Sequence, residues 1–357
     1  MKVLSVVGAR PQFVKLAPVA EALAGRCEHV IVHTGQHYDA RLSDVFFADL
    51  KIPAPDVHLG IGSASHGHQT GAMLAGIEDV LLAQRPDWVL VYGDTNSTLA
   101  ATVAAVKLHQ KVAHLEAGLR SFNRRMPEEH NRVLTDHAAD LCLAPTEVAM
   151  GHLRDEGLAA RSTMVGDVMT DVCLRVAQAV QDEPPTTAGV DPEQGYYLAT
   201  IHRAENTDDP QRLHRVVESL AALDHPVLLL AHPRLVATAE RQGLPLAQGS
   251  VVVAEPQPYP ELIRLALHSR GVVTDSGGLQ KEAFLLRVPC TTLRTETEWT
   301  ETVDLGWNVL DGDLVDVAAA AARPEPPATD AAPYGDGHAA QRVAAVLLGE
   351  TGSTSES

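Results

Sequence analysis

Apolar residues in this chain fall into two kinds of pattern that alternate along its length. Short runs rich in Val, Leu and Ala are typical of buried strands, and longer stretches with apolar residues every three or four positions are typical of helices. Strands that alternate with helices in this way form parallel sheets with helices on both faces. The predicted strands are Lys2–Val7, His29–His33, Trp88–Tyr92, Lys111–Leu115, Asp140–Ala144, Tyr196–Thr200, Pro226–Ala231, Ser250–Ala254 and a run around Val272. The predicted helices include Phe13–Leu23, Asn96–Leu108 and Ala339–Leu348.

The strands form two series, which are separated by a stretch rich in Pro and Gly at residues 182–195. A chain of 357 residues is also too long for one compact core. We therefore predict an α/β fold of two Rossmann-like domains, residues 1–170 and 171–335, whose parallel sheets face each other across a cleft. The chain ends with a helical pattern within residues 336–350 and a polar tail, residues 351–357, that we expect to be disordered.

The charge balance limits the partners of this protein. Its net charge of −18 argues against nucleic acid and anionic membranes, although local Arg and Lys residues can still bind a phosphorylated substrate. The apolar run at the N-terminus ends at Gly8, too early for a signal peptide, and no apolar stretch approaches the roughly 20 residues that span a bilayer. We therefore expect a cytoplasmic protein that makes no membrane contact.

The most informative stretch of the chain is residues 271–282, where a β-branched strand turns into a helix through Ser276, Gly277 and Gly278. Unpaired backbone N–H groups in such a turn point outward at the positive end of the helix dipole, where phosphate binds well. Glycine allows an anion to approach the backbone closely. Glu282 follows one helical turn later, in position to accept hydrogen bonds from a ribose. The alternative is an ordinary turn in which Ser276 caps the helix.

The turn after the first strand carries two cations instead of a nucleotide-binding fingerprint. It lacks the Gly-x-Gly-x-x-Gly pattern of dinucleotide sites and the Walker A pattern. Arg10 stands at the end of the strand and Lys15 about one turn into the following helix, so both side chains can reach the same cleft. Surface cations are usually only solvated, but an Arg-Pro turn directly after a strand favours contact with an anion.

Three carboxylates stand at strand ends or at a helix start in the first half. Asp94 and Glu116 each follow a predicted strand, and Glu128 opens a helix that begins with a proline. Asp94 as a helix cap and Glu128 as a partner of the helix dipole are the alternatives. Three such residues opposite a phosphate site argue against three independent caps. Crowded, partly buried carboxylates suit proton transfer because their pKa values move toward neutrality.

A metal site is not expected. His66 and His68 are spaced like metal ligands, but no third or fourth ligand lies nearby, and we expect them in a polar, glycine-rich loop.

Seven segments, taken in order, resemble the non-hydrolysing UDP-N-acetylglucosamine 2-epimerases. The resemblance runs from residue 2 to about residue 312 and implies a GT-B fold with a C-terminal helix that crosses back to the first domain. The segments lie at residues 8–15, 33–38, 93–97, 114–121, 126–132, 202–206 and 274–280.

The resemblance also implies roles for particular residues, with UDP mainly on the second domain. Ser276, Gly277 and Gly278 would hold the two phosphates, with His202 and Arg10 completing that site. Glu282 would bind the ribose hydroxyls, and Tyr259 would lie near the uracil. Asp94, Glu116 and Glu128 would form the acid–base set, with His202 also counted as catalytic and with Lys15 and Arg132 nearby.

The reaction implied for the family converts UDP-GlcNAc to UDP-ManNAc. The C2 proton is removed and UDP is expelled to give a 2-acetamidoglucal; UDP then adds back after C2 is reprotonated on the other face. No metal or redox cofactor is required, so we predict none, and we expect a UDP-sugar as the substrate and a homodimer as the assembly.

Three departures from the family pattern bear on the substrate and on regulation. Lys281 stands where an acid is common, and Trp299 stands in a segment where many members have Thr-Glu-Arg-Pro. The Trp299 form, together with residues 121–125, also occurs in relatives that epimerise UDP-2,3-diacetamido-2,3-dideoxyglucuronate, which makes that sugar the alternative substrate. Tyr38 and Asp39 change the loop that binds a second, activating UDP-sugar in bacterial members, so we expect no such activation.

Two other functions use the same phosphate site. A GT-B glycosyltransferase would need an acceptor groove and only one base, so three carboxylates argue against it. A UDP-sugar sensor without catalysis would have lost its acids, whereas this chain carries them.

Overall fold

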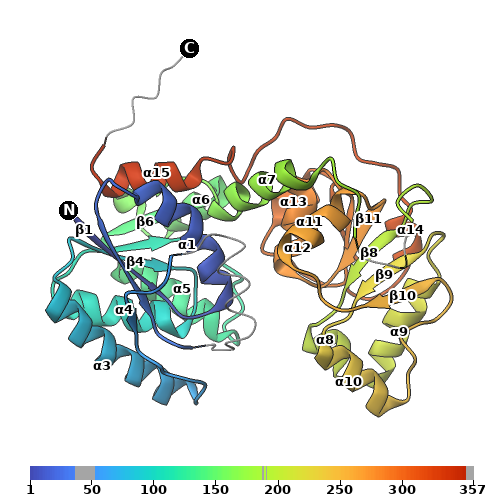
Figure 1. The fold of residues 1–357 in the computed structure, drawn as a ribbon, viewed down its shortest axis with the longest axis horizontal. Coiled ribbons are helices and arrows are strands. Elements are labelled where there is room, and N and C mark those ends of the chain that lie inside the picture. The colour runs from blue at the N-terminus through green and yellow to red at the C-terminus, as the bar shows by residue number, and fades with distance from the viewer. Residues whose placement is uncertain (37–52, 187–188, 190, 351–357) are drawn as a thin grey trace. The chain divides into compact units, whose positions relative to one another are not determined.

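The computed structural model describes residues 1–36, 53–186, 189 and 191–350 of the chain. It contains two compact units, Met1–Val172 with Ala332–Ser357, and Cys173–Ala331 (Figure 1). The predicted disordered tail, residues 351–357, lies outside the described residues.

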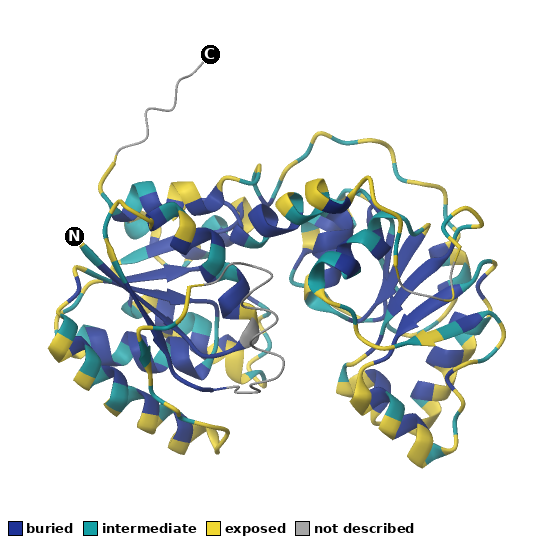
Figure 2. Ribbon diagram, in the orientation of Figure 1, coloured by how far each residue is buried: buried dark blue, intermediate teal, exposed yellow. Residues whose placement is uncertain are grey.

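The first unit is built on a parallel sheet of seven strands, in the order β3-β2-β1-β4-β5-β6-β7. Its central strands are buried on both faces, as expected for a parallel sheet covered by helices (Figure 2). The strands are β1 Lys2–Val7, β2 Glu28–His33, β3 Val57–His58, β4 Trp88–Tyr92, β5 Val112–Leu115, β6 Leu141–Ala144 and β7 Ser162–Met164.

Helices cover both faces of this sheet. On one face, α1 (Arg10–Leu23) and the C-terminal α15 (Ala339–Leu347) pack with the strands in a single apolar cluster. On the other face, α3 (His66–Gln84) and α4 (Asn96–Lys107) pack in a second cluster, where the buried alanines of α4 allow close approach to the strands. The remaining helices are α5 Pro127–Ala138, α6 Glu147–Asp155, the 3-10 helix η1 Ala159–Arg161, and α7 Val168–Val180, which continues into the second unit.

The second unit contains a parallel sheet of six strands, in the order β10-β9-β8-β11-β12-β13. The strands are β8 Tyr197–Thr200, β9 Val227–Leu230, β10 Val251–Ala254, β11 Gly271–Thr274, β12 Cys290–Thr292 and β13 Asn308–Leu310. The helices are α8 Ala204–Thr207, α9 Pro210–Ala221, α10 Pro233–Gln242, α11 Tyr259–Leu267, α12 Gly277–Leu285, α13 Thr300–Asp304 and α14 Val317–Ala321.

The predicted fold class, α/β with two Rossmann-like parallel sheets, is confirmed. Four strands of two or three residues, β3, β7, β12 and β13, escaped prediction because such short runs carry little periodicity. The helix predicted from Phe13 begins at Arg10, since Pro11 in its first turn is already set for a helix.

Two further expectations need correction or comment. His66 and His68 lie in the first turn of α3 and not in a loop. The described residues between α7 and β8 belong to the second unit. No helix in the described part of the chain is long and apolar enough to cross a bilayer.

Candidate functional site

Two ion pairs stand where β4 and β5 end in the first unit. Lys15 Nζ pairs with Glu116 Oε2, and both side chains are largely buried. Arg132 lies 2.6 Å from the carboxylate of Asp94, which keeps 30% of its side-chain surface exposed. Burial alone would lower the pKa of Lys15, but Glu116, Asp94 and Asp167 outweigh it and raise the pKa above its ordinary value. Each carboxylate therefore has a cation that stays charged beside it.

The backbone around these carboxylates adopts rare conformations. Glu116 has a φ of 70°, a left-handed value that costs a non-glycine residue energy, and such residues cluster at functional sites. Gly93, just before Asp94, has a φ of 60°. A Cβ at Gly93 would lie 3.1 Å from Glu116 Oε2 and 3.6 Å from Lys15 Nζ. Only glycine leaves room for the ion pair at this turn.

Asp94 does not cap α4. Thr95 occupies the N-cap position, and its hydroxyl accepts a hydrogen bond from the Thr98 N–H at 3.3 Å. The cap interpretation of Asp94 is therefore wrong, and its carboxylate is left to Arg132. The backbone carbonyl of Asp94 accepts a hydrogen bond from Asn131 at 2.9 Å, so the residue is fixed at two points.

Of the two adjacent glutamates of α5, the second, Glu129, is held by hydrogen bonds. Glu129 is buried and accepts hydrogen bonds from the backbone N–H groups of Ser121 and Phe122, each at 2.9 Å, and pairs with Arg132 at 2.9 Å. Burial alone would raise the pKa of Glu129, but these bonds outweigh it and lower the pKa. Glu128, the predicted acid–base residue, is exposed in the first turn of α5. The sequence offered no signal for Glu129 because its partners lie in a loop of irregular structure.

The turn after β1 uses its own backbone groups internally. The N–H groups of Gly8 and Ala9 donate to Gln12 Oε1 at 2.8 and 2.9 Å, and Gln12 Nε2 donates to the Tyr92 carbonyl at 2.8 Å. Gln12 thus joins this turn to β4, a role that sequence analysis missed. Arg10 is the first residue of α1. The N–H groups of Gly8 and Ala9 are therefore already paired with Gln12.

In the second unit, the turn from β11 to α12 has the geometry that the sequence predicted. Ser276 is the N-cap of α12 and its hydroxyl accepts a hydrogen bond from the Leu279 N–H at 3.3 Å, so the capping alternative is confirmed for this side chain. First-turn N–H groups have no partner within a helix, which still leaves Gly277 and Gly278 as donors for an anion. A Cβ at Gly277 would lie 2.4 Å from Glu298 Oε1, whereas a Cβ at Gly278 would meet only Ser276 Oγ, at 4.0 Å. The Glu298 side chain fills the space that a side chain at Gly277 would need, whereas the space beside Gly278 is open.

A buried carboxylate orients His202 beside this turn. Asp275 Oδ1 lies 3.0 Å from His202 Nδ1, and Asp275 also accepts hydrogen bonds from the Arg203 N–H and the Asn206 amide, each at 3.0 Å. Burial alone would raise the pKa of Asp275, but His202 and these donors outweigh it and lower the pKa. The His202 side chain is 50% exposed, so its other ring nitrogen is available to a ligand. Asp275 was not among the predicted site residues.

The residues expected near the ribose and the uracil contact each other. Tyr259 Oη donates a hydrogen bond to Glu282 Oε1 at 2.8 Å, and Glu282 is buried. Burial and the nearby Glu282 carboxylate raise the pKa of Tyr259 well above its ordinary value, so its hydroxyl remains a donor.

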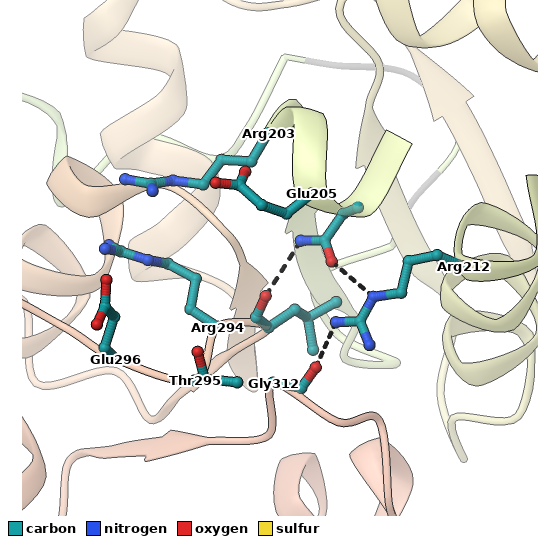
Figure 3. A pocket seen from close by; sticks show the side chains of 9 residues that line it. Arg203, Glu205, Arg212, Arg294, Thr295, Glu296 and Gly312 are labelled. Atoms are coloured by element: carbon teal, nitrogen blue, oxygen red, sulfur yellow. Dashed lines mark hydrogen bonds between the residues drawn. The ribbon is translucent and has the colours of Figure 1, made fainter. Parts of the chain in front are cut away.

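A pocket of about 340 Å³ is lined in part by Arg203, Arg212 and Arg294 (Figure 3). Arg203 and Arg294 extend in the same direction in this view (Figure 3), and Arg294 pairs with Glu298 at 2.9 Å. Arg212 closes another side through hydrogen bonds to Asn206 at 3.0 Å and to the Gly312 carbonyl. No residue that lines this pocket was a predicted site residue. In the described part of the chain, no group of three or more His, Cys, Asp or Glu residues is placed to hold a metal ion.

Comparison with known proteins identifies relatives along the whole chain. The family model described as UDP-N-acetylglucosamine 2-epimerase matches residues 21–348. The chain is 49% identical to the UDP-2,3-diacetamido-2,3-dideoxy-D-glucuronate 2-epimerase of Pseudomonas aeruginosa, over 97% of this chain and 99% of that protein.

Solved structures give the same result. The UDP-GlcNAc 2-epimerase of Methanocaldococcus jannaschii, in complex with UDP-GlcNAc and UDP, has a TM-score of 0.85 at 38% identity and covers 97% of this chain and 99% of its own. The Neisseria meningitidis UDP-GlcNAc 2-epimerase bound to UDP-GlcNAc has a TM-score of 0.84 at 28% identity, over 98% and 100% of the two chains. Tyr38 and Asp39, on which the activation prediction rests, lie outside the described residues. With a family model that spans nearly the whole sequence and relatives that match it end to end, the chain belongs to the UDP-N-acetylglucosamine 2-epimerase family.

Proposed function

We propose that this protein inverts C2 of a UDP-2-acetamido sugar by eliminating UDP and adding it back. The observation that carries this proposal is the pair of carboxylates, Asp94 and Glu116, each held against a cation at the strand ends of the first unit. Two separately oriented carboxylates are what a reaction needs when one group removes a proton from C2 and another returns it on the opposite face.

The proposed chemistry gives each unit its own task. In the elimination, the C2–H bond and the bond from C1 to the β-phosphate oxygen break, a C1–C2 double bond forms, and UDP leaves with the electron pair. Lys15 and Arg132 hold the carboxylates of Glu116 and Asp94 in place, so that each can exchange a proton with C2. The N–H groups at Gly277 and Gly278, together with His202, would stabilise the charge that develops on the diphosphate.

Two substrates fit this reaction, and one observation favours the second. UDP-GlcNAc, the first prediction, is the sugar for which relatives such as the M. jannaschii protein, 41% identical over 88% of this chain, are named. UDP-2,3-diacetamido-2,3-dideoxyglucuronate is supported by the 49% identity to the P. aeruginosa enzyme over 97% of this chain, and by Trp299. We propose the diacetamido sugar as the preferred substrate.

Proton NMR in D₂O, with each nucleotide sugar in a separate tube, tests both parts of the proposal. Deuterium should appear at C2 of both epimers, because the proton passes through carboxylates that exchange with solvent. The diacetamido sugar should turn over faster than UDP-GlcNAc. Asp94→Asn and Glu116→Gln serve as controls and should each slow turnover by at least about a hundredfold. Epimerisation that keeps the original hydrogen would refute the acid–base scheme, and no turnover of either sugar would refute the function.

The homodimer and the cytoplasmic location expected from the sequence stay predictions. Light scattering coupled to size-exclusion chromatography should give twice the chain mass of 38.1 kDa. A mass of one chain would exclude the homodimer.

A further inference from the structure

A fully buried histidine lies behind the two carboxylates, and both of its ring nitrogens face hydrogen-bond acceptors. His114 is in β5, two residues before Glu116, and none of its surface is exposed. Its Nδ1 lies 2.6 Å from Asp136 Oδ1, and its Nε2 lies 2.7 Å from the carbonyl oxygen of Gly93. A carbonyl oxygen only accepts hydrogen bonds, and an ionised carboxylate does the same. A neutral imidazole has one N–H and satisfies only one of the two contacts, unless Asp136 carries the second proton.

The surroundings of Asp136 favour its ionised form. Its second oxygen, Oδ2, lies 2.8 Å from an Arg120 guanidinium nitrogen and accepts a hydrogen bond from the Gly118 N–H at 3.0 Å. With the carboxylate ionised, the proton between the two residues belongs to the ring. His114 is then an imidazolium whose two N–H groups both donate.

The charged groups around this ring pair with one another. Arg120 pairs with Asp136 and also makes two 2.8 Å contacts to the two carboxylate oxygens of Glu156. Two cations, His114 and Arg120, thus face two anions, Asp136 and Glu156. Buried charges are tolerated when they are paired and hydrogen-bonded in this manner. Two more ionisable groups lie nearby. The exposed His137 contacts Glu156 at 3.0 Å, and Cys142 on β6 stays a neutral thiol because burial raises its pKa.

The contact between His114 and the Gly93 carbonyl acts on the backbone next to Asp94, the proposed catalytic carboxylate. The Gly93 carbonyl belongs to the peptide group that joins Gly93 to Asp94, so holding that oxygen fixes the rotation of the backbone from which the Asp94 side chain projects. The Asn131 bond to the Asp94 carbonyl holds the next peptide group along the chain. We propose that His114 is a buried imidazolium that positions Asp94 through the Gly93 carbonyl, where the positioning role rests on the proposed function of Asp94.

The protonation state is measured on the wild-type enzyme, by long-range proton–nitrogen NMR with ¹⁵N-labelled histidine. At pH 8 a solvent-exposed histidine, with an ordinary pKa of about 6.5, is neutral and shows one unprotonated nitrogen. One of the 17 histidines should instead show two N–H signals. That pattern should vanish in His114→Gln and persist in His214→Gln, a control on the exposed surface of α9. A spectrum at pH 8 in which every histidine has an unprotonated nitrogen overturns the proposal, even if His114→Gln does not fold.

The positioning role is measured by a double-mutant cycle on turnover. His114→Gln should lower kcat at least about tenfold with little change in KM, because His114 touches no substrate. In an Asp94→Asn background the same substitution should change kcat less than about twofold, since the group that it positions is already lost. Equal losses in both backgrounds would show a general structural role and overturn the positioning. If neither sugar turned over in the wild type, the proposed function would fail, while the NMR spectrum would still decide the protonation of His114.

Discussion

Substituting Gly278 with alanine should separate binding of the diphosphate from stability of the fold. The two glycines at the start of α12 look equivalent in the sequence, but their surroundings differ. A Cβ at Gly278 meets no atom closer than Ser276 Oγ at 4.0 Å. An alanine that fits a helical backbone without strain stabilises a protein by about 0.4–1 kcal/mol relative to glycine, chiefly by restricting the unfolded chain. Gly278→Ala should therefore unfold at the same temperature as the wild type or slightly higher.

If the diphosphate binds at this turn as proposed, the same methyl group would occupy space that a phosphate needs to approach the backbone. A hydrogen bond to a charged group contributes about 1.5–3 kcal/mol. Loss of one such bond lowers affinity roughly 10- to 100-fold, since about 1.4 kcal/mol corresponds to a factor of ten. Isothermal titration calorimetry should show this increase in the Kd for UDP. Gly278→Ala would then combine unchanged stability with weakened binding.

Gly277→Ala is the matched control. Its Cβ would lie 2.4 Å from Glu298 Oε1, and Glu298 pairs with Arg294 at 2.9 Å. Because this oxygen ends a flexible side chain, it can move aside, so Gly277→Ala should displace the Glu298 carboxylate from Arg294 and change the unfolding temperature only slightly. UDP affinity within twofold of wild type in Gly278→Ala would refute the assignment of the diphosphate to this turn. A lower unfolding temperature in Gly278→Ala would show that an alanine side chain does not fit at this position without strain.

Three further predictions follow from the site. Glu129→Gln should lower the free energy of unfolding by about 2 kcal/mol, because it removes a charged acceptor of three backbone and side-chain donors. Glu128→Gln should leave the denaturation midpoint unchanged and slow turnover about a hundredfold. Wild-type turnover in Glu128→Gln would instead indicate that this residue only interacts with the helix dipole. Tyr259→Phe should weaken UDP binding several-fold, because Glu282 loses the 2.8 Å bond that holds its carboxylate, and calorimetry showing wild-type affinity would place the nucleoside elsewhere. Tyr38 and Asp39 differ from the loop that the family resemblance implies for binding an activating UDP-sugar. Reverse epimerisation monitored by NMR should therefore start without added UDP-GlcNAc, and a reaction that stays silent until a trace is supplied would contradict that expectation.

The local features of this protein were determined by the sequence alone. The parallel α/β fold and the turn into α12 were predictable because they depend on periodicity and on the conformations of a few consecutive residues. The Ser276 cap and the place of Glu282 one turn later follow from the same local geometry.

The environment of each carboxylate was decided only by the tertiary structure. Lys15 reaches Glu116 across 101 positions of sequence, and Gln12 reaches the end of β4 across 80. Asp136 meets His114 because β5 and α5 pack together, and Glu129 rather than Glu128 turns inward because of the phase of one helix against a loop. The protonation state and the mobility of a buried side chain depend on the groups that surround it. Those groups come from strands and loops that are far apart in the sequence and meet only in the folded protein.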